Sequence, residues 1–112
     1  MNQLKPSQIY FTHSVISSQF TGCGKLIEDT LAEIINGDTQ ISDIPKIKVF
    51  YCQQKNGPIR YLSENNRRLW LFKELEKLGK LDYIVVRLEK TTKDKYVNNI
   101  YSLSAKMKKR YK

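Results

Sequence analysis

The chain is poor in the residues that most often carry metal or nucleophilic chemistry. Its 112 residues include one histidine, His13, and two cysteines, Cys23 and Cys52. A zinc site usually takes four ligands, so three scattered ones predict no metal site. A Cys23–His13 nucleophile pair lacks an orienting third group, and we therefore expect no catalytic residues and no cofactor. Two cysteines also form no disulfide framework, which favours an intracellular protein with reduced thiols.

Long hydrophobic runs are also missing. No stretch of about 18 apolar residues occurs, which predicts no membrane span. The first ten residues, MNQLKPSQIY, lack the apolar core of a secretory signal. The composition, 40% hydrophobic and 28% charged, is that of a globular protein, and the length fits a single domain.

Positive charge is abundant and unevenly distributed. Residues 87–112 contain nine basic and two acidic residues, a net charge of +7. The first 86 residues contain eleven basic and nine acidic ones, a net charge of only +2. This asymmetry predicts a polyanionic partner such as DNA or RNA, and a solubilising tail is the alternative interpretation. We therefore divide the chain into a domain over residues 1–90 and a basic C-terminal segment over residues 91–112.

Hydrophobic periodicity predicts an α+β domain with a small mixed β-sheet and two main helices. Strands are expected over residues 8–16, 46–52, 59–62 and 83–88, and helices over residues 26–36 and 66–78. The Asn56-Gly57 pair indicates a hairpin turn, because both residues accept positive φ angles easily. Asn65 is the expected N-cap of the second helix, and Gly37 and Gly79 are expected to end the two helices.

The predicted helices differ in how clearly they separate apolar from polar residues. The apolar face expected for the first helix consists of Leu26, Ile27, Leu31, Ile34 and Ile35. The face expected for the second consists of Leu71, Phe72, Leu75 and Leu78. Trp70 falls outside that second face, which makes it a candidate partner-binding residue. The alternative is a second buried face that the C-terminal segment covers.

The C-terminal segment allows two interpretations. Tyr96, Ile100, Leu103 and Met107 recur at helical spacing, which is typical of a helix that docks through one apolar side. A disordered basic tail from about residue 105 is the alternative. In both cases its cations are candidate nucleic-acid contacts, because lysine and arginine neutralise phosphates without sequence preference. These candidates are Lys106, Lys108, Lys109 and Arg110.

The segment from Arg60 to Leu75, RYLSENNRRLWLFKEL, resembles the ParB-type pattern of a strand, a tight G-x-R-R turn and a helix beginning R-x-x-A. Arg67 and Arg68 match the double arginine, while Asn65 replaces the turn glycine. Together with the order of elements over residues 9–88, this resembles the ParB/sulfiredoxin-like superfamily. The resemblance implies that the arginine turn binds phosphate groups, which in ParB proteins belong to the nucleotide CTP.

Other family features differ in this chain. Leu71 stands where the ParB pattern has a small alanine, and Asn66 stands where sulfiredoxins have their catalytic cysteine. The resemblance therefore implies no sulfinic acid reductase activity. In size and type the chain also resembles the small ParB-like accessory subunits of protist DNA adenine methyltransferase complexes.

The start of the second helix is the main candidate site. Free backbone N–H groups and the helix dipole favour an anion there, and the guanidinium groups of Arg67 and Arg68 add forked donors for phosphate oxygens. Pairing of one arginine with Glu64 is the alternative. The loop over residues 17–25 is a second candidate for holding a phosphate, although an ordinary connection is the simpler interpretation.

These observations predict a non-catalytic accessory subunit of a nuclear DNA-processing complex. It would contact the DNA backbone without sequence specificity and bind partner proteins. A CTP-binding switch and a purely structural scaffold are the alternatives.

Overall fold

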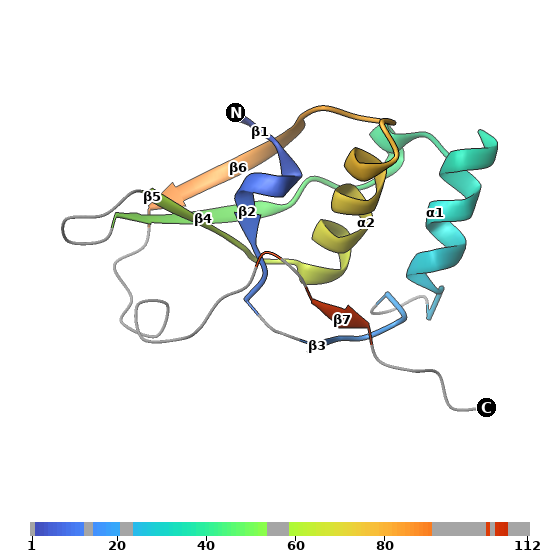
Figure 1. Ribbon diagram of the computed structural model, residues 1–112, viewed down its shortest axis with the longest axis horizontal. Coiled ribbons are helices and arrows are strands. Elements are labelled where there is room, and N and C mark those ends of the chain that lie inside the picture. Colours follow the sequence, from blue (N-terminus) through green and yellow to red (C-terminus); the bar gives the residue numbers. More distant parts are fainter. Residues whose placement is uncertain are drawn as a thin grey trace.

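The structure is a computed structural model that describes residues 2–12, 15–20, 24–53, 59–90, 103 and 105–107 (Figure 1). Within these residues two helices and a mixed sheet confirm the predicted α+β class. In chain order the elements are β1 (Asn2–Leu4), the 3-10 helix η1 (Pro6–Gln8), β2 (Ile9–Tyr10), β3 (Val15–Ile16), α1 (Ile27–Asn36), the 3-10 helix η2 (Ile41–Asp43), β4 (Lys48–Gln53), β5 (Ile59–Ser63), α2 (Asn66–Lys77), β6 (Ile84–Lys90) and β7 (Lys106–Met107).

Five of the strands form one mixed sheet in the order β1-β6-β4-β5-β2, curled like half of a barrel. β1 pairs with β6 and β4 pairs with β5 in antiparallel orientation, whereas β6 runs parallel to β4 and β2 runs parallel to β5. β3 and β7 form a separate parallel ribbon. Because β5 is paired on both sides, its carboxyl end, where α2 begins, is held firmly in place.

The predicted hairpin is confirmed by the register of β4 and β5. Val49 lies opposite Ser63 at one end of the pair, and Gln53 lies opposite Ile59 at the other. The Asn56-Gly57 turn itself lies outside the described residues.

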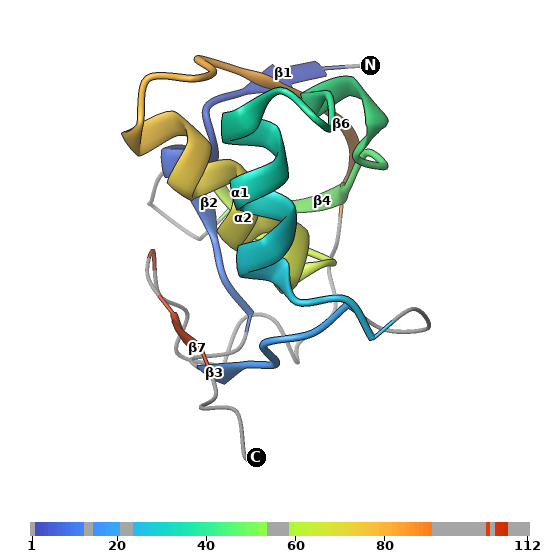
Figure 2. The same ribbon diagram turned by 90° about the vertical axis from the view of Figure 1, so that its right-hand side faces the viewer.

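α2 lies between the sheet and α1 (Figure 2). Leu69 and Phe72 pack into the cluster that the sheet contributes, whereas Leu71 and Leu75 pack against Ile27 of α1. Apolar side chains on two sides of this one helix are therefore buried. Burial of each such side chain stabilises the folded state by about 1.5–3 kcal/mol. This double burial fixes the position of the first turn of α2.

The predicted helix ends are largely confirmed. Asn65 caps α2, while Gly37 (φ 84°) and Gly79 (φ 72°) adopt the left-handed conformation after the two helices. Two of the predicted face residues are wrong: Ile35 is 44% exposed and Leu78 is 52% exposed. Both residues lie at the C-terminal ends of their helices. The elements that pack against the middle of each helix do not extend this far, so these two apolar side chains stay exposed.

The strand predicted over residues 8–16 is wrong as a single element. Residue 8 ends η1, β2 belongs to the main sheet, and β3 belongs to the separate ribbon. The Thr12 N–H donates to Asn66 Oδ1 at 2.9 Å, and the Thr12 hydroxyl donates to the Ser63 carbonyl at 3.2 Å. Acceptors from the β5–α2 turn thus take the place of strand pairing. β1 was not predicted, because its partner β6 lies about 80 residues away along the chain.

The C-terminal segment returns to the body of the protein. Lys106 lies opposite Val15 and Met107 opposite Ile16 in the β3–β7 ribbon, and Ala105 is partly buried against the core. The prediction of a helix that reaches Met107 is therefore wrong at its C-terminal end. Residues 106 and 107 pair with the distant strand β3 despite the helical spacing of the apolar residues. Tyr96 and Ile100 lie outside the described residues. No helix in the described part of the chain is long and apolar enough to cross a membrane.

Candidate phosphate-binding site

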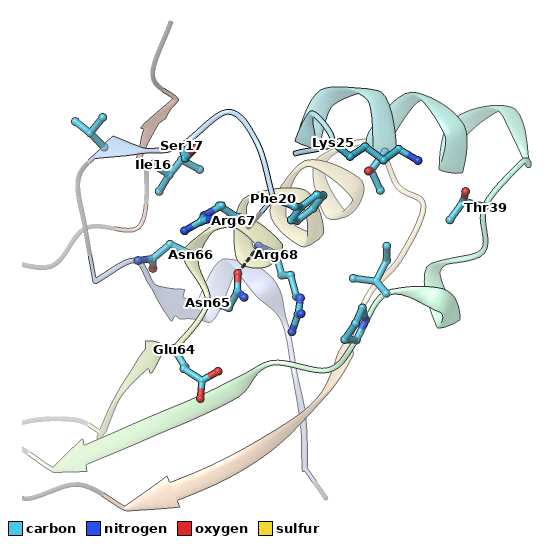
Figure 3. Close-up of a pocket in the computed structure, with 14 residues that line it drawn as sticks. Ile16, Ser17, Phe20, Lys25, Thr39, Glu64, Asn65, Asn66, Arg67 and Arg68 are labelled. Carbon is cyan, nitrogen blue, oxygen red and sulfur yellow. Dashed lines mark hydrogen bonds between the residues drawn. The ribbon is translucent and has the colours of Figure 1, made fainter. Parts of the chain in front are cut away.

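A cavity of about 570 Å³ lies at the N-terminal end of α2 (Figure 3). Its walls come from the segment between β3 and α1, from the connection that follows α1, and from the β5–α2 turn. The volume falls in the range of small-molecule sites. Three cationic side chains and one anionic side chain line it: Lys25, Arg67, Arg68 and Glu64.

The β5–α2 turn is held by its own polar side chains. Asn65 Oδ1 accepts from the Arg68 backbone N–H at 3.0 Å, and Ser63 Oγ accepts from the Asn65 N–H at 3.1 Å. The remaining N–H groups of the first turn of a helix have no acceptor within that helix. The turn therefore presents donors and the positive end of the helix dipole to the cavity.

Asn66 ties this turn to the end of β2. Its Oδ1 accepts from the Thr12 N–H at 2.9 Å, and its Nδ2 donates to Thr12 Oγ1 at 2.9 Å. Its side chain joins two segments that are 54 residues apart, which is a structural task.

The two arginines diverge from one another instead of forming a single clamp. Arg67 extends toward Ile16 and Ser17, and one of its guanidinium N–H groups donates to the Gln19 carbonyl at 3.4 Å (Figure 3). Arg68 extends into the other side of the cavity, away from Arg67 (Figure 3). Among the described residues, the Arg68 guanidinium makes no hydrogen bond and no ion pair. Arg68 is thus the better placed of the two for an incoming anion.

The other charged side chains around the cavity are mutually paired. Lys25 forms an ion pair with Glu33, and Lys48 Nζ lies 3.9 Å from Glu64 Oε2 and 3.5 Å from Glu89 Oε1. Glu64 therefore pairs with Lys48 of β4. The alternative interpretation, in which Glu64 pairs with Arg67 or Arg68, is not observed. These pairs are partly exposed and contribute little stability.

The loop over residues 17–25 and the arginine turn line the same cavity. Ser17, Phe20 and Lys25 line it together with Arg67 and Arg68, and the Lys25 ammonium points away from both arginines (Figure 3). Sequence reasoning treated these segments as separate candidates, because only the tertiary structure brings them together. It missed Thr12 and Ser63, whose roles depend on contacts with a turn far away in the chain.

The other predicted site residues lie elsewhere. Trp70 is half-buried, packs against both core clusters and lines a different cavity. The backbone of Lys106 belongs to β7, beside a wall of the candidate site, since Val15 and Ile16 line it. Lys108, Lys109 and Arg110 lie outside the described residues.

The described residues contain no group of three or more His, Cys, Asp or Glu side chains that could hold a metal ion. His13 and Cys23 lie outside the described part of the chain. In the comparisons with known proteins, no family model, curated protein or solved structure matches this chain.

Proposed function

We propose that the protein is a non-catalytic accessory module that binds the phosphate backbone of DNA at the N-terminal end of α2. The observation that carries this proposal is the position of Arg68. Its guanidinium extends into a cavity beside the first turn of α2 and has no partner among the described residues. A forked cation next to free helix N–H groups suits a phosphate oxygen.

The distribution of charge supports a polymeric ligand. The cavity is lined by three cations and one anion, and the anion is already within 4 Å of Lys48. β7 ends at Met107 next to the cavity wall residue Ile16, and the next residues in the sequence are KKRYK. Cations that directly follow β7 in the sequence are suited to further contacts along a phosphate backbone.

The ParB/sulfiredoxin-like fold belongs to the same proposal. Support comes from the succession of β5, a tight turn capped by Asn65, and a helix that carries two arginines in its first turn. The methyltransferase complex and the nuclear location likewise remain proposals, which rest on the resemblance and on the basic charge.

The test is fluorescence anisotropy of labelled duplex DNA at several salt concentrations. Arg68→Gln removes the cavity cation, and Arg60→Gln is the matched control. Arg60 lies on β5, outside the cavity, over the Tyr10 ring at 5.1 Å. We expect Arg68→Gln to weaken binding and to reduce the slope of log K against log salt by about 0.9, the value for one lost phosphate contact. Equal effects of the two substitutions would contradict the site, and no binding by the wild type would contradict the function.

The contribution of the tail requires substitutions instead of truncation. Cutting the chain after residue 103 would also remove Ala105, which packs against the core, and β7, which pairs with β3. Glutamine at Lys108, Lys109 and Arg110 removes three charges and leaves those contacts intact. We expect the salt slope to fall by up to about 3.

A mononucleotide such as CTP is the second candidate ligand. The cavity volume of about 570 Å³ favours it, because small ligands usually occupy concave sites of this size. Calorimetry with the four nucleoside triphosphates separates the two functions. Saturable heat that is lost in Arg68→Gln, together with no DNA binding, would replace the DNA proposal with the nucleotide one.

A further inference from the structure

A second cavity, of about 270 Å³, lies along the flank of α2. Phe11 and Trp70 form part of its wall, and Leu103 and Ala105 of the returning C-terminal segment form another part. The polar lining residues are Ser7, Lys73, Glu74, Glu76 and Lys77. The cavity therefore combines an apolar wall with an amine whose side chain is largely covered.

That amine belongs to Lys73, which is only 8% exposed. Its Nζ lies 5.3 Å from the centroid of the Phe11 ring. It makes no hydrogen bond or ion pair with any described residue. The side chain is therefore largely covered by its neighbours, while its nitrogen keeps some contact with solvent.

The two carboxylates nearest in sequence are engaged elsewhere. Glu76 accepts from the Ser7 N–H at 2.8 Å and from Ser7 Oγ at 3.1 Å, one bond to each oxygen. Glu74 pairs with Lys77 at 3.3 Å. Burial lowers the pKa of Lys73 to about 8. The negative charge of Glu76 acts in the opposite direction and raises this pKa, whereas the positive charge of Lys77 lowers it further. These three side chains are the only other charged groups among the described residues that line the cavity.

We propose that Lys73 is a covalent binding site for a small apolar aldehyde. The neutral amine adds to the carbonyl carbon, and the resulting carbinolamine loses one water to form an imine. The proton released from the ammonium goes to solvent, and no oxidant or reductant is needed. A partly desolvated amine beside an apolar wall favours this chemistry, because desolvation increases the share of the neutral, nucleophilic form.

The shape of the cavity selects the aldehyde. Its aromatic and aliphatic walls suit a planar or short-chain apolar body, and its volume suits a compound of about the size of benzaldehyde. At pH 7.5 about a quarter of an amine of pKa 8 is neutral, against about 0.1% for an ordinary lysine. The lower basicity offsets part of this gain, and we expect Lys73 to react at least about 10-fold faster than an exposed lysine.

The test is competitive labelling of the full chain with benzaldehyde and cyanoborohydride, which reduces the imine to a stable secondary amine. Peptide mass spectrometry at low conversion compares Lys73 with Lys80, an exposed lysine just after the same helix and outside the cavity. The same reaction in concentrated urea supplies the unfolded reference. We expect preferential labelling of Lys73 in the folded chain only, with a pH midpoint near 8.

Ala105→Leu fills part of the cavity and leaves Lys73 in place, and it should abolish the preference while leaving Lys80 labelling unchanged. Equal labelling of Lys73 and Lys80 in the folded wild type would overturn the proposal. A preference that survives in urea would overturn it as well, because the cavity would then not be its cause.

Discussion

Replacement of Lys73 by methionine is expected to stabilise the protein at neutral pH. Methionine keeps the unbranched apolar part of the side chain and is a good helix former, so mainly the charge is lost. Below pH 8 the lysine is charged in both the folded and the unfolded chain, and the folded state carries the whole cost of burying it. The pKa is about 8 when folded and 10.5 when unfolded. Between these values the unfolded chain binds more protons, so the stability of the wild type rises with pH.

The size of the effect follows from the same values. A change from 10.5 to about 8 corresponds to about 3 kcal/mol, at about 1.4 kcal/mol per pH unit. Because the nitrogen keeps some contact with water, this value is an upper bound, and we expect Lys73→Met to be more stable by up to about 3 kcal/mol near pH 7. The advantage should shrink by about 2 kcal/mol by about pH 9.5, because the wild type gains that much as its folded amine loses the proton.

Urea unfolding followed by circular dichroism at about pH 7 and about pH 9.5 measures this difference. Lys80→Met is the matched control, because it removes the same charge from an exposed position just after the same helix and should change stability by less than about 0.5 kcal/mol. A destabilised Lys73→Met at both pH values would refute the reasoning. An advantage that does not change with pH would show that the gain comes from packing and not from the buried charge.

Three further experiments test the fold. Asn65→Ala should lower stability by about 1 kcal/mol through loss of the α2 cap, and Asn65→Asp should retain it, as thermal unfolding would show. Leu71→Ala should cost about 2–5 kcal/mol in urea unfolding, whereas Leu78→Ala, at an exposed position, should cost under about 1 kcal/mol. Gly37→Ala should cost about 1 kcal/mol, because φ is 84° there, and an unchanged melting temperature would contradict that backbone conformation.

Local signals in the sequence predicted the elements whose causes are local. The cap at Asn65, the glycines after the helices and the hairpin pairing all depend on residues a few positions apart, and all three were found. The strand over residues 8–16 failed for the opposite reason. Its apolar pattern is genuine, but Thr12 bonds to a turn more than 50 residues away and Val15 pairs with Lys106. No local pattern contains that information.

The candidate site shows the same division. Residue type and helix position were enough to select Arg67 and Arg68, because cations at the start of a helix have an obvious use. Their divergence could not be predicted, since it depends on the Gln19 carbonyl in another segment. Lys73 was missed because a lysine in an amphipathic helix normally faces water. Only the packing of β2 and the C-terminal segment around α2 shows that this one does not.

The two proposed sites share one helix but should behave independently. The cavity at the N-terminal end of α2 and the cavity along its flank have no lining residue in common among those described. Substitutions without shared partners usually have additive effects on stability. Lys73→Met should therefore leave DNA or nucleotide binding unchanged, and Arg68→Gln should leave aldehyde labelling unchanged. If either substitution altered the other site, α2 would have to shift as a rigid body between the sheet and α1, and its double burial argues against such movement.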